Sequence, residues 1–394
     1  MAKQTIEHVE LSGKRVFLRV DFNVPLEDGR ITDDTRITAT LPTIQHCLKS
    51  GAALVLASHL GRPKGKADPA YSLGPVAARL EEILAQPVTL LPDCVGPEVE
   101  RQVRALQPGQ VVMLENLRFH AEEEANDDGF ARQLAALGDV YVDDAFAAAH
   151  RAHASIDAIT RYLQPAVAGL LMARELSALG RIVSGAERPV WAILGGAKVS
   201  DKLALVEHLL AQVDGLLIGG GMAFTFLASL GHGVGRSLIE PDRQPLARTI
   251  LERARARGIP LRLPVDVVVA AGPGDTTGLR TVAIREIPAD LMGLDIGPAT
   301  VAQFAAALKG AKTVVWNGPM GVFEKEPFAA GTLGVAKAVS ECGAFSVVGG
   351  GDTIAAVQQA GVMPRISYVS TAGGAFLEFL EGRALPGVAA LNEA

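Results

Sequence analysis

The stretch VWAILGGAK, which spans Val190–Lys198, joins an apolar run to a glycine pair and a lysine. The apolar run is typical of a buried strand in a parallel sheet. Glycines directly after such a strand let a phosphate approach the backbone closely, and a helix that begins there offers free N–H groups. The stretch therefore predicts an α/β fold with an anion site beyond the carboxyl end of a strand.

Short apolar runs alternate with amphipathic segments along the rest of the chain, as in parallel sheets whose strands are joined by crossover helices. One such helix is predicted at Pro75–Gln86, where Val76, Leu80 and Ile83 recur at helical spacing. The other predicted strands are Arg15–Val20, Ala52–Ala57, Val88–Leu91, Gln110–Leu114, Asp139–Val142, Leu216–Ile218, Val265–Ala270, Thr313–Trp316, Phe345–Val348 and Ile366–Val369.

The chain of 394 residues is long enough for two or three domains. A single helix at Pro165–Leu179 and a looser segment at Gly180–Pro189 separate two halves of similar architecture. We predict an α/β protein with two Rossmann-like parallel-sheet domains, joined by a hinge helix, and with the active site in the cleft between them. The expected limits are residues 1–170 for the first domain, 171–188 for the helix and linker, and 189–379 for the second domain.

Composition excludes several classes of protein. Hydrophobic residues make up 49% of the chain, which excludes disorder as its dominant state, and a net charge of −6 argues against general nucleic-acid binding. Cys47, Cys94 and Cys342 are odd in number and far apart, so they predict neither a disulfide framework nor a Cys-x-x-Cys metal site. The N-terminus has no secretory pattern, and the apolar stretch Gly215–Gly231 is too short to span a membrane. We expect a cytoplasmic protein that binds neither membrane nor nucleic acid.

In the first half, the predicted strand ends lead into basic residues. The arginines concerned are Arg19, Arg36, Arg62, Arg118 and Arg151. Guanidinium groups match phosphate and carboxylate oxygens and stay charged, so their convergence on one sheet edge predicts a pocket for a small polyanion. Asp21 and Asn23 either bond a substrate hydroxyl or hold the arginines in place, and His59 either contacts the anion or is structural.

The spacing His150-x-x-His153 also raises the question of a metal. No cysteine or third histidine lies nearby in the sequence, and the flanking Arg151 would repel a cation. Contact with an anion, or a structural hydrogen bond, is the better interpretation.

In the second half, the predicted strand ends lead into glycine turns. These turns are Gly195–Lys198, Gly219–Gly221, Asn317–Gly321, Gly349–Thr353 and Thr371–Gly374. Lys198 and Lys202 lie four residues apart at the start of a predicted helix, on one face from which both could reach phosphates. Asp352 is the candidate Mg²⁺ ligand and also a candidate N-cap, and Glu324 either accepts a ribose hydroxyl or lies on the surface. Neither a P-loop nor a dinucleotide fingerprint is present, which argues against P-loop enzymes and nicotinamide-dependent dehydrogenases.

Seven segments match a known family in order and spacing. They are RVDFNVP (Arg19–Pro25), SHLGRP (Ser58–Pro63), ENLRF (Glu115–Phe119), HRAHAS (His150–Ser155), GGAKV (Gly195–Val199), WNGPMGVFE (Trp316–Glu324) and GGGDT (Gly349–Thr353). On these motifs the chain resembles phosphoglycerate kinase along nearly its full length. The resemblance implies a phosphotransferase with a carboxyl acceptor, which moves the acyl phosphate of 1,3-bisphosphoglycerate to ADP, reversibly and with Mg²⁺, giving 3-phosphoglycerate and ATP in glycolysis.

The resemblance also implies the residues of each site. The triose site is expected at Asp21, Phe22, Asn23, Arg36, His59, Leu60, Gly61, Arg62, Arg118 and Arg151. The nucleotide site is expected at Lys202, Gly293, Asn317, Glu324, Gly350, Gly351, Asp352 and Thr353, with Asp352 holding the metal. The catalytic residues are expected to be Arg36, Lys198, Gly373 and Gly374.

The family further implies a monomer and a C-terminal segment, about residues 380–394, that returns to the first domain. The acceptor carboxylate is ionised at neutral pH, so positioning and charge neutralisation should carry the transfer, with closure about residues 165–189. Three positions depart from the family pattern. Asp143 and Ala147 stand where Asn and Gly are usual, and Ala372 replaces the first of three glycines, where an alanine resists positive φ.

Overall fold

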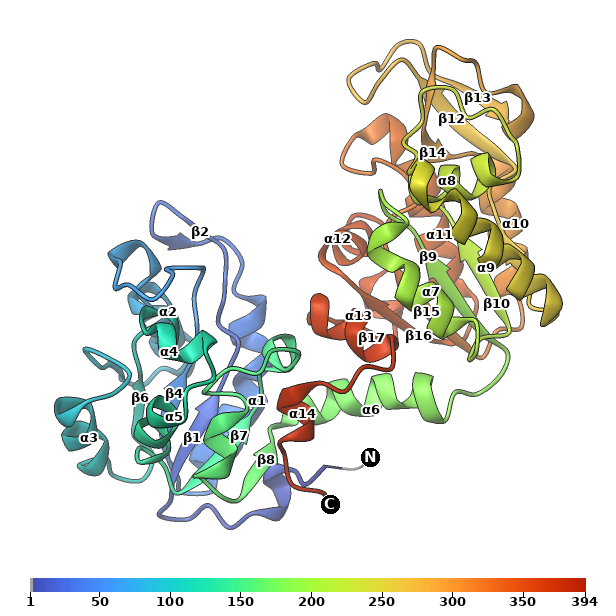
Figure 1. The fold of residues 1–394 in the computed structure, drawn as a ribbon. Coiled ribbons are helices and arrows are strands. Elements are labelled where there is room, and N and C mark those ends of the chain that lie inside the picture. Colours follow the sequence, from blue (N-terminus) through green and yellow to red (C-terminus); the bar gives the residue numbers. More distant parts are fainter. Residues whose placement is uncertain (1–2) are drawn as a thin grey trace. The chain divides into compact units, whose positions relative to one another are not determined.

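The protein is seen here in a computed structural model that describes residues 3–394, apart from the side chain of residue 184. Its contacts divide the chain into two units, and Figure 1 shows a sheet with flanking helices in each. Unit 1 comprises Met1–Ser177 with Ala384–Ala394, and unit 2 comprises Ala178–Arg383. Within residues 3–394, no helix has the length and apolar character that crossing a bilayer requires.

Unit 1 is built on one parallel sheet in the order β5-β6-β4-β1-β7-β8. The strands are β1 (Arg15–Arg19), β4 (Ala53–Ala57), β5 (Val88–Leu90), β6 (Val111–Met113), β7 (Val140–Asp143) and β8 (Ala166–Ala168). Five of them confirm predicted strands to within a residue at each end. The central strands β1 and β4 are almost completely buried, because helices cover both faces of such a sheet.

The longer helices of unit 1 each bury apolar residues. The α-helices of unit 1 are α1 (Thr35–Lys49), α2 (Gly74–Leu84), α3 (Pro97–Arg104), α4 (Ala121–Glu124), α5 (Asp128–Ala135) and α14 (Pro386–Ala389). Its 3₁₀ helices are η1 (Ile6–His8), η2 (Pro69–Tyr71), η3 (Leu117–Phe119), η4 (Phe146–Ala148) and η5 (Ala158–Arg161). Strands β2 (Leu26–Glu27) and β3 (Arg30–Ile31) form a separate hairpin. In α2, Val76 and Leu80 are buried, as the predicted spacing requires. Near the C-terminus, the Asn392 N–H donates to the Ala166 carbonyl oxygen over 2.9 Å.

Unit 2 contains a second parallel sheet, in the order β11-β10-β9-β15-β16-β17. Its strands are β9 (Val190–Leu194), β10 (Gly215–Ile218), β11 (Leu261–Arg262), β15 (Thr313–Asn317), β16 (Phe345–Gly349) and β17 (Tyr368–Ser370). The strand order reverses between β9 and β15, and ligands of open parallel sheets bind at such a reversal. The stretch from Val190 to Leu194 thus lies at the centre of the sheet. The predicted α/β class with two parallel-sheet units is confirmed.

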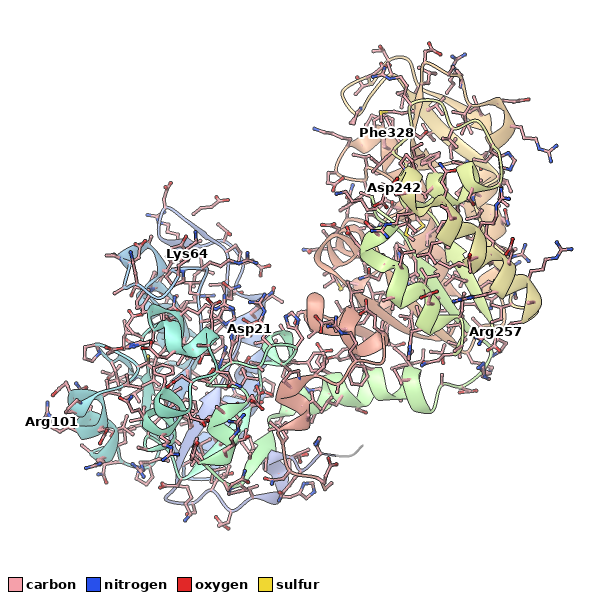
Figure 2. All side chains as sticks on the ribbon, viewed as in Figure 1. Asp21, Lys64, Arg101, Asp242, Arg257 and Phe328 are labelled. Atoms are coloured by element: carbon pink, nitrogen blue, oxygen red, sulfur yellow. The ribbon has the colours of Figure 1, made fainter. Side chains whose placement is uncertain are left out.

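Seven α-helices flank the sheets of unit 2 in the described part of the chain. They are α7 (Leu203–Leu209), α8 (Met222–Ser229), α9 (Gln244–Ala256), α10 (Pro298–Leu308), α11 (Ala330–Glu341), α12 (Gly351–Gln359) and α13 (Gly374–Leu380), with 3₁₀ helices η6 (Ser200–Lys202), η7 (Pro241–Arg243), η8 (Ile284–Glu286), η9 (Glu326–Phe328) and η10 (Met363–Arg365). Phe328 is buried, whereas charged side chains such as Arg101 of α3 extend from the surface (Figure 2).

The predicted helix at Pro165–Leu179 is wrong at both ends. Residues Ala166–Ala168 form β8 beside β7, and helix α6 runs from Leu170 to Ser184. The Asp144 carboxylate caps its first turn, because Oδ1 accepts from the N–H groups of Leu171 and Met172 over 2.8 and 3.0 Å. A short apolar run does not distinguish a strand from a helix by periodicity alone, and pairing with β7 decides the matter here.

The predicted strand at Val265–Ala270 exists but does not belong to the parallel sheet. Strand β12 (Asp266–Ala270) lies between β13 (Arg280–Ala283) and β14 (Met292–Ile296) in a separate antiparallel sheet. Strand direction depends on the partner strands, which the apolar run itself does not specify. This small sheet carries Gly293 and so contributes to the candidate site of unit 2.

Candidate active site

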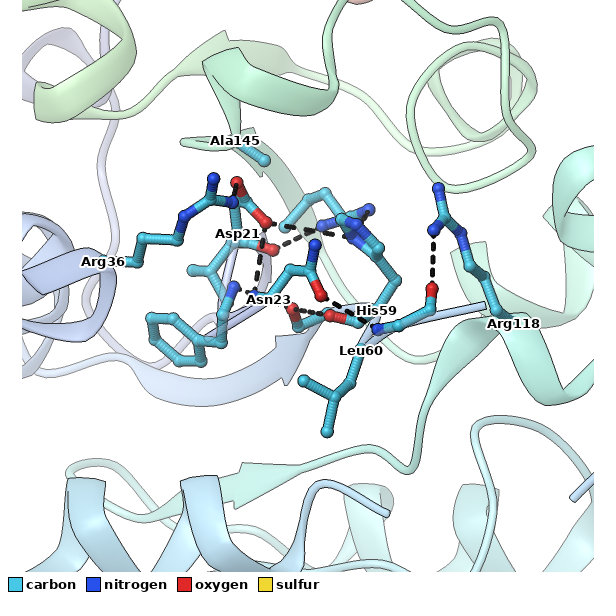
Figure 3. A network of polar contacts seen from close by, with 12 residues as sticks. Asp21, Asn23, Arg36, His59, Leu60, Arg118 and Ala145 are labelled. Carbon is cyan, nitrogen blue, oxygen red and sulfur yellow. Dashed lines mark hydrogen bonds and ion pairs between the residues drawn. The ribbon is translucent and has the colours of Figure 1, made fainter. Parts of the chain in front are cut away.

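Polar side chains gather at the carboxyl ends of β1 and β4 in unit 1, as Figure 3 shows. Asp21 is buried and forms an ion pair with Arg36 of α1. The Asn23 side-chain oxygen accepts from the Gly61 N–H over 2.9 Å, which ties the loop after β1 to the loop after β4. Asp21 therefore holds an arginine in place, as one of the two sequence interpretations has it. We call the group Asp21, Asn23, Arg36, His59, Gly61, Arg118 and Arg151 the arginine site.

The buried Arg19 supports this site through its contact with His59. It is 1% exposed, and its Nε donates to Ser155 Oγ over 2.8 Å while Nη2 lies 3.2 Å from His59 Nδ1. Ser155 Oγ in turn donates to the buried Glu123 carboxylate over 2.6 Å. A buried carboxylate thus compensates a buried guanidinium through one hydroxyl. No pattern in the sequence indicates a role for Glu123, because a run of glutamates such as that of α4 is typical of a solvated helix face.

Arg118 and Arg151 carry further positive charge. Arg118 is 5% exposed, and its Nη1 donates to the Gly61 carbonyl over 2.8 Å. Burial lowers the pKa of Arg118, and Arg151 and Arg19 lower it further, whereas Glu124 opposes the shift. Guanidinium groups that raise one another's energy in this way favour an anion between them. Arg62 is exposed, and no hydrogen bond or ion pair joins its side chain to another described residue.

Two histidines of this region, His59 and His153, have lowered pKa values. Burial, followed by Arg19 and Arg118, lowers the pKa of His59 well below its usual value. Burial and the same two arginines lower the pKa of His153 to about 3. Because these histidines lie among arginines, they suit contact with an anion and not ligation of a cation. Phe22 and Leu60 are buried and shape the site through packing.

Two of the departures from the family pattern lie beside this site. Ala147 belongs to the 3₁₀ helix η4 and has no left-handed backbone that would require glycine. Asp143 is completely buried, and burial raises its pKa to about 7. Its Oδ1 accepts from the Ala145 N–H over 2.9 Å, but Oδ2 is buried without a partner among the described residues.

Unit 2 contains a cavity of about 390 Å³ at the carboxyl end of its parallel sheet. Its lining includes the predicted residues Gly293, Glu324 and Asp352, together with backbone of the turns at Gly196 and Gly220. Apolar side chains line the rest, among them Phe224, Leu238, Val267 and Met320. We call this space the glycine cavity. A partly apolar cavity beside glycine turns suits a planar base with attached phosphates. Sequence reasoning missed the apolar lining, because such residues are typical of a core.

Lys202 and Asn317 lie close to this cavity. The Lys202 ammonium donates to the Asn317 carbonyl over 3.1 Å and also to its side-chain oxygen. Burial lowers the pKa of Lys202 to about 8, although Asp352 and Asp201 raise it. Thr353 Oγ1 accepts from the Gly318 N–H over 2.7 Å, which joins the turns after β15 and β16. These residues are brought together but do not line the cavity itself.

The predicted shared helical face of Lys198 and Lys202 is wrong. Lys198 is exposed in the turn before η6, and α7 begins only at Leu203. The Glu240 carboxylate accepts from the N–H groups of Val199 and Ser200 over 2.6 and 3.0 Å. The two N–H groups are therefore bonded to a carboxylate and not to the carbonyl groups of a helix. The Lys198 side chain stays in solvent.

Asp352 fits a magnesium ligand. It lies exposed in the first turn of α12 and lines the cavity, so its hard oxygen faces the place where phosphates would lie. The N-cap interpretation is wrong, because the N-cap is Gly350, with φ of 94°, and no side chain caps the helix. Gly351 begins the helix itself, and its free N–H groups favour an anion.

The last glycine turn accommodates its alanine without strain. The left-handed residue is Gly373, with φ of 53°, and α13 begins at Gly374. Ala372 is 3% exposed and is not among the residues with positive φ. The expected conflict at Ala372 is therefore absent. The turn follows β17, the neighbour of β16 in the sheet.

Taken together, the fold and the two sites define an α/β enzyme of two parallel-sheet units, one with fixed positive charge and one with a glycine-lined cavity. The sequence model of the family described as phosphoglycerate kinase matches residues 6–383. Phosphoglycerate kinase of Moorella thermoacetica is 56% identical over 393 residues and covers 100% of both chains, and that of Pelotomaculum thermopropionicum is 54% identical over 391 residues, or 99% of each. The structure of the Coxiella burnetii enzyme superposes with a TM-score of 0.92 at 42% identity over 98% of each chain. The chain belongs to the phosphoglycerate kinase family.

Proposed function

We propose that the arginine site binds the phosphorylated acid and that the glycine cavity binds the nucleotide. Membership of the family makes the protein a phosphotransferase with a carboxyl acceptor (EC 2.7.2.3). It moves the acyl phosphate of 1,3-bisphosphoglycerate to ADP, reversibly, giving 3-phosphoglycerate and ATP in glycolysis. The observation that carries our assignment is the presence in one chain of two differently built sites. Arg36 is held by the Asp21 carboxylate and the buried Arg118 by the Gly61 carbonyl in one unit, and a glycine cavity lies beside a lysine in the other.

The arginine site suits a small acid with a phosphate group. Arg36, Arg118 and Arg151 supply charge that cannot be lost at neutral pH, and Asp21 and Asn23 fix the loops that present it. Asp21 pairs with Arg36 and the Asn23 side-chain oxygen bonds Gly61, so either would accept a substrate hydroxyl beside the bond that it already makes. Arg62 is exposed and free to turn toward an anion. His59 completes the site as a neutral hydrogen-bonding group.

The glycine cavity suits a nucleoside diphosphate. Phe224, Leu238 and Val267 offer an apolar surface to the base, and Glu324 is placed to accept a ribose hydroxyl. Lys202, Asn317, Gly350, Gly351 and Thr353 lie where the phosphates would follow, because their turns share one sheet edge. A bound Mg²⁺ would neutralise phosphate charge there, and Asp352 is the residue that would hold it.

Catalysis would then depend on positioning and charge. The acceptor carboxylate is ionised at neutral pH, so no residue needs to remove a proton from it. We assign Arg36 and Lys198 to stabilise the charge on the moving phosphoryl group, and the N–H groups at Gly373 and Gly374 to bond its oxygens. In-line transfer requires the phosphates held by the two sites to come together.

A coupled assay of ATP formation from ADP and 1,3-bisphosphoglycerate tests the proposal, run with Asp352→Asn beside the wild type. We expect product only with Mg²⁺, and a higher Mg²⁺ requirement for Asp352→Asn. Product formation without a divalent ion, or an unchanged requirement in the variant, would contradict the assignment of Asp352. Nicotinamide reduction in place of ATP formation would contradict the activity.

We also propose a cytoplasmic monomer that binds neither nucleic acid nor membrane. Its three cysteines are free thiols, two of them buried, which suits a reducing compartment. The limits expected for the domains, 1–170 and 189–379 with the C-terminal return, stay part of this proposal. Light scattering on the protein as it elutes from a size-exclusion column, with and without both substrates, measures its mass directly. A dimer in either state would contradict the proposed monomer.

A further inference from the structure

Asp93, Cys94 and His120 form a cluster of metal-ligating groups outside both sites. One donor atom from each residue lies within 4.8 Å of the other two. His120 Nε2 is 2.7 Å from Asp93 Oδ1, and both of these side chains are partly exposed, whereas Cys94 is fully buried. The cluster therefore combines an oxygen, a sulfur and a nitrogen, two of them reachable from solvent.

Separate elements of unit 1 hold the donors in place. Asp93 and Cys94 lie in the loop between β5 and α3, and His120 follows η3. The Cys94 N–H donates to Asp93 Oδ1 over 2.6 Å, which fixes that carboxylate beside the thiol. The His120 ring stacks on Phe130 at 5.1 Å between centroids, which fixes the plane of the imidazole. Ligand orientation of this kind distinguishes a built site from a chance grouping.

A cavity of about 480 Å³ adjoins the cluster and is lined by Asp93, His120, Asp68 and Glu115 among others. The cavity leaves room for water on an ion held by the three side chains. Its acidic lining also favours a cation over an anion. The exposed Asp68 offers a further oxygen at the edge of the same cavity.

We propose that Asp93, Cys94 and His120 bind a divalent transition-metal ion of the zinc class, with the remaining coordination position open to this cavity. Thiolate and imidazole ligands select Zn²⁺ or Co²⁺, whereas Mg²⁺ and Ca²⁺ require oxygen ligands alone. Binding forms a metal–sulfur bond and releases the thiol proton of Cys94 to solvent. The ion also separates Asp93 from His120, whose direct contact it replaces.

Titration of the apo-protein with Co²⁺ alone tests this proposal, in a Cys342→Ser background that removes the partly exposed thiol. A thiolate ligand gives a charge-transfer absorption band in the near ultraviolet, and tetrahedral Co²⁺ gives intense visible bands. We expect one Co²⁺ per chain with both features, and displacement by Zn²⁺ but not by Mg²⁺. Oxygen-only sites elsewhere, Asp352 included, cannot give the thiolate band.

Variants separate the ligands from the rest of the chain. Cys94→Ser should abolish the charge-transfer band, and His120→Gln and Asp93→Asn should weaken Co²⁺ binding about 10-fold or more. The matched controls are Cys47→Ser, which removes the other buried thiol, and His8→Gln, which removes a histidine of η1.

A structural role for the cluster gives a different result. An Asp93–His120 ion pair over an inert thiol would give no charge-transfer band in the background protein, or a band that His120→Gln leaves unchanged, and either result overturns the proposal. If Cys94→Ser fails to fold, thermal unfolding of the background protein with Zn²⁺ decides. Stabilisation by Zn²⁺ that His120→Gln loses supports the site, and equal stabilisation of both proteins overturns it.

Discussion

The arginine site and the glycine cavity both lie at the carboxyl ends of strands in parallel sheets, yet the first is built from side chains and the second partly from backbone. In unit 1 the site is made of side chains, and Arg19, at the end of β1, and Arg118 of η3 are almost fully buried. In unit 2 the loops after β9 and β15 present backbone, with Gly196 at φ of 102° and Gly318 at φ of 94°. The comparison teaches that the parallel sheet supplies the position, while the residues after each strand select the ligand.

The two sites also differ in how they stabilise charged groups. The buried Arg19 guanidinium needs a nearby carboxylate, which Glu123 provides through Ser155, and Asp21 pairs with the partly exposed Arg36. Glycine turns carry no net charge, and the charged groups at the cavity of unit 2 include Glu324 and Asp352 in its lining and Lys202 beside it, bonded to Asn317. The affinity for the acid should therefore fall when one charged side chain of the arginine site is removed. The affinity for the nucleotide should fall when the space in the glycine cavity is reduced. Arg36→Ala, Arg118→Ala and Gly293→Ala test that contrast directly, and Lys198→Ala and Asp143→Asn test what lies outside the two binding surfaces.

Lys198→Ala should have the largest effect, because it removes a charge expected to act on the moving phosphoryl group and belongs to neither binding surface. We expect turnover to fall about 10²–10³-fold, with much smaller changes in ADP affinity, measured by steady-state kinetics and titration calorimetry. Lys337→Ala, at an exposed position of α11, is the matched control. Wild-type turnover in Lys198→Ala would remove this lysine from the mechanism.

Arg36→Ala and Arg118→Ala should weaken 3-phosphoglycerate binding while ADP affinity stays nearly unchanged. A charge-assisted hydrogen bond contributes about 1.5–3 kcal/mol, which corresponds to roughly 10–150-fold in the dissociation constant. Calorimetric titration of each ligand measures both effects, and Arg101→Ala on α3 is the control, because that side chain is 73% exposed. Weaker ADP binding with unchanged acid binding would show that the two sites have been assigned the wrong way round.

Gly293→Ala should produce the opposite pattern through sterics. A Cβ at Gly293 would overlap the Phe224 ring, and because both residues line the glycine cavity the clash changes the space available there. Overpacking costs about 1–3 kcal/mol, so we expect ADP to bind roughly 5–150-fold more weakly, with the acid unaffected. Gly272→Ala, where a Cβ meets nothing within 4 Å, is the control. Unchanged ADP affinity in Gly293→Ala would place the nucleotide elsewhere.

Asp143→Asn should change stability more than binding. Burial raises the pKa of Asp143 from 3.8 to about 7, so the native state holds this proton more tightly than the unfolded chain. Its contribution to stability is therefore lost as the pH rises from about 4 to 7. Asn cannot ionise, and we expect the variant to gain about 1–3 kcal/mol over the wild type at pH 8 and little at pH 4.

Urea unfolding at both pH values measures this gain. Asp139→Asn is the matched control, because a side-chain hydrogen bond from Arg15 lowers the pKa of Asp139. That variant should lose stability at pH 8. A loss of stability at pH 8 in Asp143→Asn would mean that Asp143 is ionised and paired in the native state.

Much of this architecture could be predicted because parallel strands are continuous apolar runs that end in turns. The strand Val190–Leu194 occurs with the predicted limits, and the others differ by a residue or two. The predictions of secondary structure were wrong where contacts with a distant segment decide the local structure. Residues Ala166–Ala168 became a strand because β7 lies beside them, and Lys198 stayed outside a helix because Glu240 bonds the following turn.

The sites divide in the same way. Arg36, Arg118 and Asp352 could be proposed from the sequence, because Arg118 and Asp352 follow predicted strand ends and Arg36 follows the loop after the first predicted strand. Glu123 and Phe224 could not, because a glutamate in an acidic run and an aromatic residue in an apolar helix are typical of surface and core. Their roles come from contacts with Ser155 and Gly293, both far away in the chain.

By itself, the sequence determined the two parallel-sheet units and the chemistry at their strand ends, because periodicity and turn residues act over a few neighbouring positions. Only the tertiary structure decided which distant groups meet. The Asp93–Cys94 pair and His120 are separated in the sequence by a strand and two helices, and folding brings their donor atoms within 4.8 Å. Such a meeting depends on how elements pack, and no local pattern records it.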